Sequence, residues 1–218
     1  MSDRKPSLAD RRVDYIRGGL TEAEAGNDPI ALFEQWFDAA HETTTGPEYE
    51  ANVMTLATVT PQGRPAARIV LLKGYDPAGF VFFTNYDSHK GRDLAANPYA
   101  ALVFHWIHLE RQVRIQGPVE KTSRAESEAY FASRPRGSQL GAWVSNQSEQ
   151  IDRQQMQARL AELEAHYGDG PVDCPPHWGG YRVKPEIIEF WQGRPSRLHD
   201  RIVFQRQGEN WRRERLGP

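Results

Sequence analysis

Val53-Met54-Thr55-Leu56-Ala57-Thr58-Val59 is an apolar, β-branched run, and Pro61-Gln62-Gly63 after it has the composition of a tight turn. This pattern is typical of a β-strand that leads into a hairpin. Similar runs follow along the chain, at Arg68–Lys73, Phe80–Thr84, Tyr99–Trp106 and Gln112–Val119. Short strands joined by tight turns predict an antiparallel meander that closes into a barrel.

Helices are expected around this β region. Asp28 can cap a helix that Pro29 opens, and apolar residues recur along it. A short helix through Leu94 should end at Asn97-Pro98. Further helices are expected at about 123–132 and 151–166, and further strands at 181–184, 187–192, 202–205 and 211–215. Strands and helices do not alternate regularly, so we expect a mainly β fold with peripheral helices rather than a parallel βαβ fold.

Residues 1–28 are rich in charge and glycine, and Gly18-Gly19 has the composition of a hinge. We therefore expect a mobile N-terminal arm over residues 1–28 and a single domain over residues 29–218. The first residues lack the apolar run of a signal peptide, and no stretch reaches the roughly 20 apolar residues that span a bilayer. The single Cys174 fits a reducing compartment. These features predict a cytoplasmic protein with no membrane partner.

The composition also excludes several classes of function. The 27 basic and 29 acidic side chains give a formal charge of −2, which argues against a nucleic-acid partner. One cysteine allows neither an intrachain disulfide nor a thiolate metal cluster. The sequence has no GxGxxG fingerprint, no phosphate loop ending in GK[ST], no HExxH and no GxSxG. His105 and His108 have no convincing ligand spacing, so no metal site is expected.

Basic residues stand beside aromatic and hydroxyl side chains at the ends of the expected strands. Arg68 and Lys73 bracket one strand, Thr84 ends the next, and Lys90 begins a helix. Phosphate binds such groups through charge-assisted hydrogen bonds. Positions five apart face opposite sides of a strand, so Arg68 and Lys73 serve one small anion only if the strand bends, and otherwise two ligands are bound. The alternative is a set of solvated charges at strand ends.

Two further clusters carry possible ligand groups. Tyr130 and Arg134 are four residues apart on an expected helix face, and Ser138 follows in an expected loop. They could hold a second phosphate, or they could form an ordinary helix end with a cation that complements the helix dipole. The second of these clusters, around Arg197-Leu198-His199-Asp200-Arg201, places three potential cations at even spacing, on one side of an extended chain. It either faces an anionic or electron-rich ligand, with Trp191 against a planar cofactor, or forms a polar outer strand face.

This last region carries a family resemblance. Glu189-Phe190-Trp191-Gln192-Gly193 followed by Arg197-Leu198-His199-Asp200-Arg201 resembles the signature of the pyridoxine/pyridoxamine 5'-phosphate oxidases. The resemblance runs from Arg12 onward and includes, in the family's order, Arg68-Ile69-Val70-Leu71-Leu72-Lys73, Glu110-Arg111-Gln112-Val113, Ser133-Arg134-Pro135-Arg136, Gly141-Ala142-Trp143-Val144-Ser145 and Trp178-Gly179-Gly180-Tyr181-Arg182. It implies an antiparallel split β-barrel and a homodimer with FMN at the subunit interface.

The resemblance also implies residue roles. The FMN contacts would be Arg68, Ile69, Val70, Leu71, Leu72, Lys73, Phe83, Thr84, His89, Lys90, Gln112, Gln147, Ser148, Trp191 and Arg201, with Arg68 and Lys90 on the FMN phosphate. The substrate phosphate would be bound by Lys73, Tyr130, Arg134 and Ser138. Arg197 and His199 would flank the pyridine ring as the catalytic residues, and Arg12 and Tyr15 would fold over the bound substrate. Two bound phosphates would account for the spacing of Arg68 and Lys73.

The activity that the resemblance implies is oxidation of pyridoxamine 5'-phosphate and pyridoxine 5'-phosphate to pyridoxal 5'-phosphate, by hydride transfer to FMN, with O2 as acceptor and H2O2 as product. This is the last step of vitamin B6 cofactor synthesis and salvage. Two positions depart from the family's pattern. His89 stands where arginine is typical, which makes one contact near the FMN phosphate weaker or pH-dependent. Glu50 replaces a shorter acidic residue.

Other functions remain open on the sequence alone. The nearest is a different flavin split-barrel enzyme, such as a reductase that uses a nicotinamide or deazaflavin donor. A non-catalytic carrier of pyridoxal phosphate or FMN would retain its ligand without turnover, and it would leave the cluster of Tyr130, Arg134, Ser138, Arg197 and His199 without a purpose. Peroxide formation from pyridoxamine phosphate without an added reductant would distinguish the oxidase from both.

Overall fold

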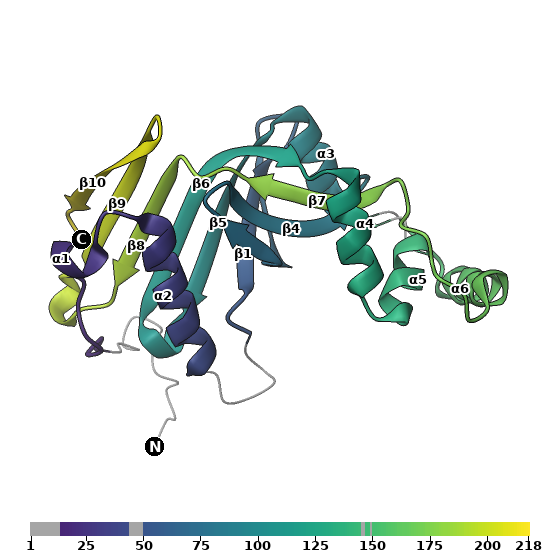
Figure 1. Ribbon diagram of the computed structural model, residues 1–218, viewed down its shortest axis with the longest axis horizontal. Helices are drawn as coiled ribbons and strands as arrows, with labels where there is room; N and C mark the ends of the chain where they lie inside the picture. Colours follow the sequence, from purple (N-terminus) through teal and green to yellow (C-terminus); the bar gives the residue numbers. More distant parts are fainter. Residues whose placement is uncertain (1–13, 44–49, 145–146, 149) are drawn as a thin grey trace, which may run out of the picture. The chain divides into compact units, whose positions relative to one another are not determined.

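The computed structural model describes residues 14–43, 50–144, 147–148 and 150–218. The chain forms two compact units (Figure 1). The first unit combines residues 1–51, 105–114 and 188–218, and the second combines residues 52–104 and 115–187. Arg12, which was expected at the substrate, lies outside the described residues.

The second unit is built from antiparallel strands. β1 (Val53–Val59) pairs with β2 (Pro65–Leu71) from Val53 opposite Leu71 to Val59 opposite Pro65, and on its other side with β5 (Tyr99–Trp106). β4 (Gly79–Asn85) lies between β3 (Gly74–Asp76) and β7 (Trp178–Val183), and β7 also pairs with β6 (Arg111–Lys121). The core of this unit is apolar and fully buried, and includes Met54, Leu56, Phe80, Phe82, Leu102, Phe104 and Ile115.

Four helices belong to the second unit. α3 (His89–Ala96) begins at the cap Ser88, whose side chain accepts from the Gly91 N–H. α4 (Arg124–Ser133), α5 (Arg136–Val144) and α6 (Arg153–Tyr167) are drawn in green in Figure 1. They share a second apolar cluster that contains Phe131, Leu140, Val144, Leu163, Val172 and Trp178.

The first unit packs helices against three C-terminal strands. Its strand order is β10 (Asn210–Leu216), β9 (Asp200–Gln207) and β8 (Ile187–Gln192), followed by the beginning of β6. α1 (Glu22–Ala25) and α2 (Pro29–Glu42) precede them in the chain, and two short 3-10 helices, η2 (Ile107–Leu109) and η3 (Pro195–Arg197), lie in loops. Trp36 of α2 meets Phe190 of β8 edge-on, with ring centroids 5.2 Å apart.

Most expected elements are confirmed. The strands over 53–59 and 99–106 have the predicted bounds, and Asp28 caps α2 through the Ile30 N–H with Pro29 in the first turn. Three expectations were wrong. Arg134 follows α4 in an extended conformation, with φ of −73° and ψ of 149°, so it does not continue the helix face that carries Tyr130. Ser138 lies inside α5, not in a loop. Arg197 does not lie in an extended chain, because Ser196 and Arg197 have φ of 56° and 61° and β9 begins only at Asp200. Even spacing therefore does not place Arg197, His199 and Arg201 on one strand face.

No helix in the described ranges is long and apolar enough to cross a membrane. Within the same ranges, no group of three or more His, Cys, Asp or Glu side chains is arranged to hold a metal ion.

Candidate functional site

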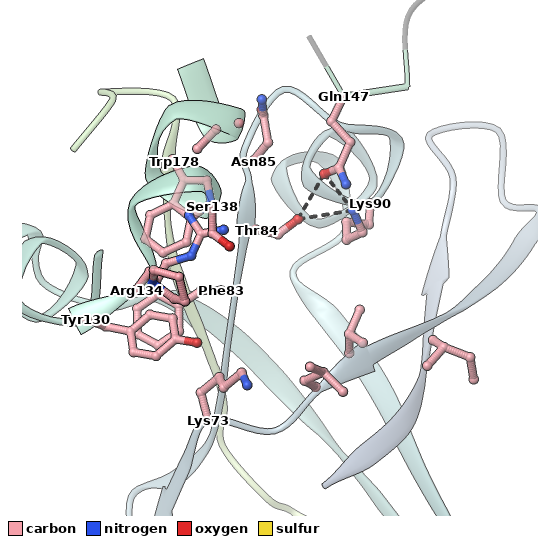
Figure 2. A pocket seen from close by; sticks show the side chains of 16 residues that line it. Lys73, Phe83, Thr84, Asn85, Lys90, Tyr130, Arg134, Ser138, Gln147 and Trp178 are labelled. Carbon is pink, nitrogen blue, oxygen red and sulfur yellow. Dashed lines mark hydrogen bonds between the residues drawn. The ribbon is translucent and has the colours of Figure 1, made fainter. Parts of the chain in front are cut away.

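The four residues expected to bind the substrate phosphate line one cavity of the second unit, with a volume of about 630 Å³. Lys73 follows β2, Tyr130 belongs to α4, Arg134 follows α4, and Ser138 belongs to α5. Figure 2 shows the last three side chains gathered at one side of the cavity, with Lys73 directed into its lower part. The remaining lining includes expected flavin contacts: Ile69, Val70, Leu71, Phe83, Thr84, Lys90 and Gln147.

Arg134 presents an unsatisfied cation to this cavity. Its guanidinium lies over the Trp178 ring, 4.7 Å from the centroid, and burial lowers its pKa. Its Nη1 is buried without a hydrogen-bond partner. A buried, charged donor without an acceptor is costly, so the site is complementary to an anion with several acceptor oxygens.

An aromatic wall supports Arg134. The rings of Phe83 and Tyr130 stack with centroids 4.1 Å apart, and Phe83 stacks on Trp178 at 5.5 Å. Arg124 donates to the backbone oxygens of Cys174, Pro175 and Trp178, so it holds the loop that leads to this wall. The wall is a rigid, apolar surface against which a flat ring can pack.

Lys90 and its partners form the opposite side of the cavity (Figure 2). The Lys90 ammonium donates to Thr84 Oγ1 at 3.0 Å, to Ser88 Oγ at 3.2 Å and to Gln147 Oε1 at 3.0 Å. Burial, together with the charge of Arg68, lowers the Lys90 pKa to about 8. None of the ion pairs among the described residues includes Lys90, so this buried cation is also prepared for an anionic ligand.

Arg68 lines a second cavity of about 870 Å³ in the same unit. Its Nη1 donates to Thr58 Oγ1 at 2.7 Å, and its Nη2 lies 3.5 Å from Asp93 Oδ2. Burial lowers the Arg68 pKa, whereas the charge of Asp93 opposes that shift. Lys90, Gln147 and Ile69 line both cavities, and His89 and Ser148 line the second. Arg68 thus lines the second cavity and Lys73 the first, which fits one of the alternatives that their spacing left open, namely two ligands.

Tyr15, Trp191 and His199 form an aromatic cluster in the first unit. The Tyr15 ring meets both others edge-on with centroids 5.6 Å apart, and Trp191 and His199 are 4.6 Å apart. The Arg194 N–H donates to His199 Nδ1 at 3.1 Å. In the neutral ring the proton is therefore on Nε2, which makes Nε2 the donor.

The other expected residues of the first unit have separate surroundings. Arg197 is exposed and adopts the left-handed conformation, which costs a non-glycine residue free energy and is frequent at functional sites. Arg201 is held by Glu189, with Nε 2.8 Å from Oε1, and donates to the Gly217 oxygen. Gln112 is half-buried on β6. In the second unit, Leu72 is buried and lines neither cavity.

Trp178 and Asp93 line the cavities and have clear structural roles there, although neither was assigned a role from the sequence. The Trp178 ring packs against the Arg134 guanidinium. The sequence around Trp178 was part of the resemblance, but no role was given to its side chain. Asp93 accepts from Thr58 Oγ1 at 2.6 Å and orients Arg68. Its position three residues after Lys90, one turn along the same helix, is the signal that could have indicated this role.

Comparisons with known proteins identify the family. Residues 41–167 match the family model of pyridoxamine 5'-phosphate oxidase, and residues 178–218 match that of the pyridoxine 5'-phosphate oxidase C-terminal dimerisation region. The chain belongs to the pyridoxamine 5'-phosphate oxidase family. Relatives named pyridoxine/pyridoxamine 5'-phosphate oxidase include one from Ralstonia nicotianae, 59% identical over 97% of this chain and 99% of the relative, and one from Rubrobacter xylanophilus, 57% identical over 97% and 96%.

Solved structures support the same family and the split-barrel fold. PhzG from Burkholderia lata, in complex with tetrahydrophenazine-1-carboxylic acid, has a TM-score of 0.83 and 30% identity, covering 91% of this chain and 98% of its own. A pyridoxamine 5'-phosphate oxidase-related, FMN-binding protein from Nostoc punctiforme has a TM-score of 0.70 at 16% identity, covering 89% and 100%. The expected mainly β fold with peripheral helices is confirmed.

Proposed function

We propose that the chain oxidises pyridoxamine 5'-phosphate and pyridoxine 5'-phosphate to pyridoxal 5'-phosphate, with FMN as cofactor and O2 as final acceptor. The observation that supports this is a cavity with two cations that form no ion pair among the described residues. Half-buried Arg134 lies beside an aromatic wall on one side, and buried Lys90 lies on the other. Two anionic tails with flat rings between them fit this arrangement. The relatives at 57–59% identity carry the oxidase name over nearly their whole length.

The residues present fit FMN. Lys90 and Arg68 offer cations to a phosphate. The half-exposed strand β2, which lines both cavities, offers backbone groups to a planar ring. When bound, FMN would accept the hydride from the substrate C4' and pass two electrons to O2, giving H2O2. The protein would align the two rings and place charge, which is where an enzyme of this kind supplies its catalytic effect.

Two sets of residues would orient the substrate. Lys73, Tyr130, Arg134 and Ser138 would bind its phosphate. Arg197 and His199 would flank its pyridine ring, His199 donating from Nε2 because Nδ1 accepts from Arg194. Tyr15 and Arg12 would cover the substrate as part of a mobile arm over residues 1–28, before a single catalytic domain over residues 29–218. Gln112, Trp191 and Arg201 would complete the FMN contacts.

We also propose a cytoplasmic homodimer with FMN at the subunit interface. The C-terminal match to a dimerisation region supports association of two copies. Ile69 on β2 is 62% exposed and lines both cavities, which is an unusual place for an uncovered isoleucine unless a ligand or a second copy covers it.

A visible spectrum tests the proposal directly. The purified protein should be yellow, should bleach when pyridoxamine 5'-phosphate is added without oxygen, and should regain colour on aeration with one H2O2 formed per pyridoxal 5'-phosphate. Pyridoxamine without its phosphate is the matched control substrate, and it should bleach the flavin far more slowly. A protein that binds FMN but bleaches only with a nicotinamide or deazaflavin donor would be a reductase of the same fold, and the proposal would fail.

A further inference from the structure

Side chains near the C-terminus hold residues 17–26 by their backbone. Arg194 Nη1 donates to the Gly18 oxygen at 2.8 Å, Arg213 Nη1 to the Glu22 oxygen at 2.7 Å, and Arg215 Nη2 to the Leu20 oxygen at 2.8 Å. Asp200 Oδ2 accepts from the Leu20 N–H at 3.0 Å. Each contact joins positions at least 176 residues apart in sequence, so the segment is fixed by tertiary contacts and not by its own helix of four residues.

Arg215 connects most of these contacts. Its Nε and Nη2 bind the two carboxylate oxygens of Glu22 at 2.6 and 3.0 Å, and its Nη1 binds Asp200 Oδ1 at 2.7 Å. These hydrogen bonds lower the Glu22 pKa to about 2 and raise the Arg215 pKa. The planar fork of arginine is required, since one ammonium could not reach both carboxylates and the Leu20 oxygen together.

The held segment is continuous with Tyr15. The Arg17 N–H donates to Glu110 Oε2 at 2.9 Å, and Gln192 Nε2 donates to the Arg17 oxygen at 2.9 Å. Two residues earlier, the Tyr15 ring lies against His199 and Trp191 and leaves no room for a Cβ at Gly193, which would lie 2.8 Å from Tyr15 Cγ. A Cβ at Gly19 would likewise lie 2.6 Å from Arg194 Nη1. Tyr15 is thus anchored on one side by a tightly packed segment.

We propose that Arg215 is a positioning residue for Tyr15, which meets the substrate in the proposed function. Through Glu22, Leu20 and Asp200 it fixes residues 17–26, and in this way it keeps the Tyr15 ring against His199 and Trp191. The inference rests on the proposed function, in which Tyr15 and His199 meet the substrate. Residues 17–26 would then be a fixed part of the arm proposed above over residues 1–28.

The test uses the FMN-loaded full-length protein and two matched variants of β10. Arg215→Gln removes the contacts, and Arg212→Gln removes an arginine three positions away that pairs with Glu214 on the same strand. Trypsin cleavage after Arg17 is followed by the mass of fragment 18–218. We expect about fivefold faster cleavage in Arg215→Gln and no change in Arg212→Gln, because cleavage follows the population of the locally open segment.

Kinetics separate positioning from general stability. In Arg215→Gln the KM for pyridoxamine 5'-phosphate should rise about fivefold with an unchanged FMN dissociation constant. Adding Arg215→Gln to Tyr15→Ala should then raise the KM no further, because the two residues act through one contact. Glu22→Gln is a milder change that should also speed cleavage after Arg17. It replaces Arg215→Gln in the test if Arg215→Gln folds poorly.

Unchanged cleavage after Arg17 in both Arg215→Gln and Glu22→Gln would overturn the proposal, and so would additive KM effects of Tyr15→Ala and Arg215→Gln. If Arg215→Gln is cleaved faster than the wild type but the wild type shows no turnover, the proposed function would be contradicted. The anchoring of residues 17–26 would still be supported.

Discussion

Arg134 joins three properties that a lysine at the same position could not supply together. Its guanidinium stacks on Trp178, it carries a full charge in a half-buried place, and Nη1 points to no protein acceptor. We predict that Arg134→Lys raises the KM for pyridoxamine 5'-phosphate roughly 10- to 100-fold, the range for losing one charge-assisted hydrogen bond of about 1.5–3 kcal/mol. Steady-state kinetics measure this.

The matched control for that change is Arg159→Lys. Arg159 lies on α6 and pairs with Glu162 at 3.1 Å on an exposed surface, so its replacement should leave the KM as it is. FMN affinity should be unchanged in both variants. If Arg134→Lys weakened FMN binding instead of substrate binding, Arg134 would belong to the cofactor phosphate and the assignment of the two phosphates would be reversed.

If Lys90 binds the FMN phosphate as proposed, FMN binding should depend on pH. Burial depresses its pKa to about 8 without ligand, and only the ammonium form attracts a phosphate. The FMN phosphate is a dianion above its second pKa of about 6. Affinity should therefore be highest between about pH 6 and 8 and should fall as the pH rises above 8, as Lys90 loses its proton.

Fluorescence titration of FMN at several pH values measures this dependence. Lys90→Met should bind FMN more weakly at pH 7 and should show no decline between pH 8 and 10. A wild-type affinity that stays constant up to pH 10 would mean that the phosphate does not lie on Lys90.

At the scale of elements, α3 places Lys90 through a close contact with the backbone before it. A Cβ on Gly91 would collide with the Tyr86 carbonyl oxygen, which cannot move as a side chain can. We predict that Gly91→Ala destabilises the protein by roughly 1–3 kcal/mol, as overpacking does, and weakens FMN binding because the helix start shifts. Chemical denaturation and FMN titration measure the two effects.

Gly137→Ala is the matched helical control. Gly137 lies in α5, and a Cβ there would meet nothing within 4 Å. Since alanine has the higher helix propensity, this variant should be neutral or more stable by up to about 1 kcal/mol. An equal loss of stability in Gly91→Ala and Gly137→Ala would show that space around Gly91 is not the cause.

The same two helices show what the sequence can and cannot predict. α3 was expected as a short helix through Leu94 because Asn97-Pro98 is a strong local signal for a helix end, whereas its cap Ser88 was not predicted. α5 was missed because Pro135, Gly137 and Gly141 resemble a loop, whereas tertiary burial of Leu140 and Val144 stabilises the helix. The turn at Ser196 and Arg197 was also missed, since positive φ at non-glycine residues leaves no local signal.

Convergence on the site is the property that local pattern could least predict. Lys73, Tyr130 and Ser138 lie on separate elements and meet only because β4, β7 and the three helices after β6 fold together. The spacing of Arg68 and Lys73 indicated only that one small anion could not bind both on a straight strand, because alternation along a strand is a local property. The two residues line different cavities, and the assignment of a phosphate to each stays a prediction. Local spacing grouped Tyr130, Arg134 and Ser138, but only the resemblance assigned these residues and Lys73 to one substrate phosphate.

For the whole molecule, an FMN site at the subunit interface would couple cofactor binding to association. If two copies bury FMN between them, FMN must bind the dimer more tightly than the monomer, and by reciprocity FMN must strengthen the dimer by the same factor. We predict that saturating FMN lowers the dimer dissociation constant at least tenfold. Sedimentation equilibrium with and without FMN measures this, and FMN titration at two protein concentrations measures the reciprocal effect.

Ile69→Glu tests which surface is involved. Ile69 lies on β2, which is half-exposed over its length, and a carboxylate there would oppose both a second copy and an anionic cofactor. The variant should be monomeric and colourless, whereas Ile107→Glu, another exposed isoleucine that lines neither cavity, should still bind FMN. A monomer of Ile69→Glu that retained FMN with unchanged affinity would separate the cofactor site from the interface, because the coupling requires that the two be lost together.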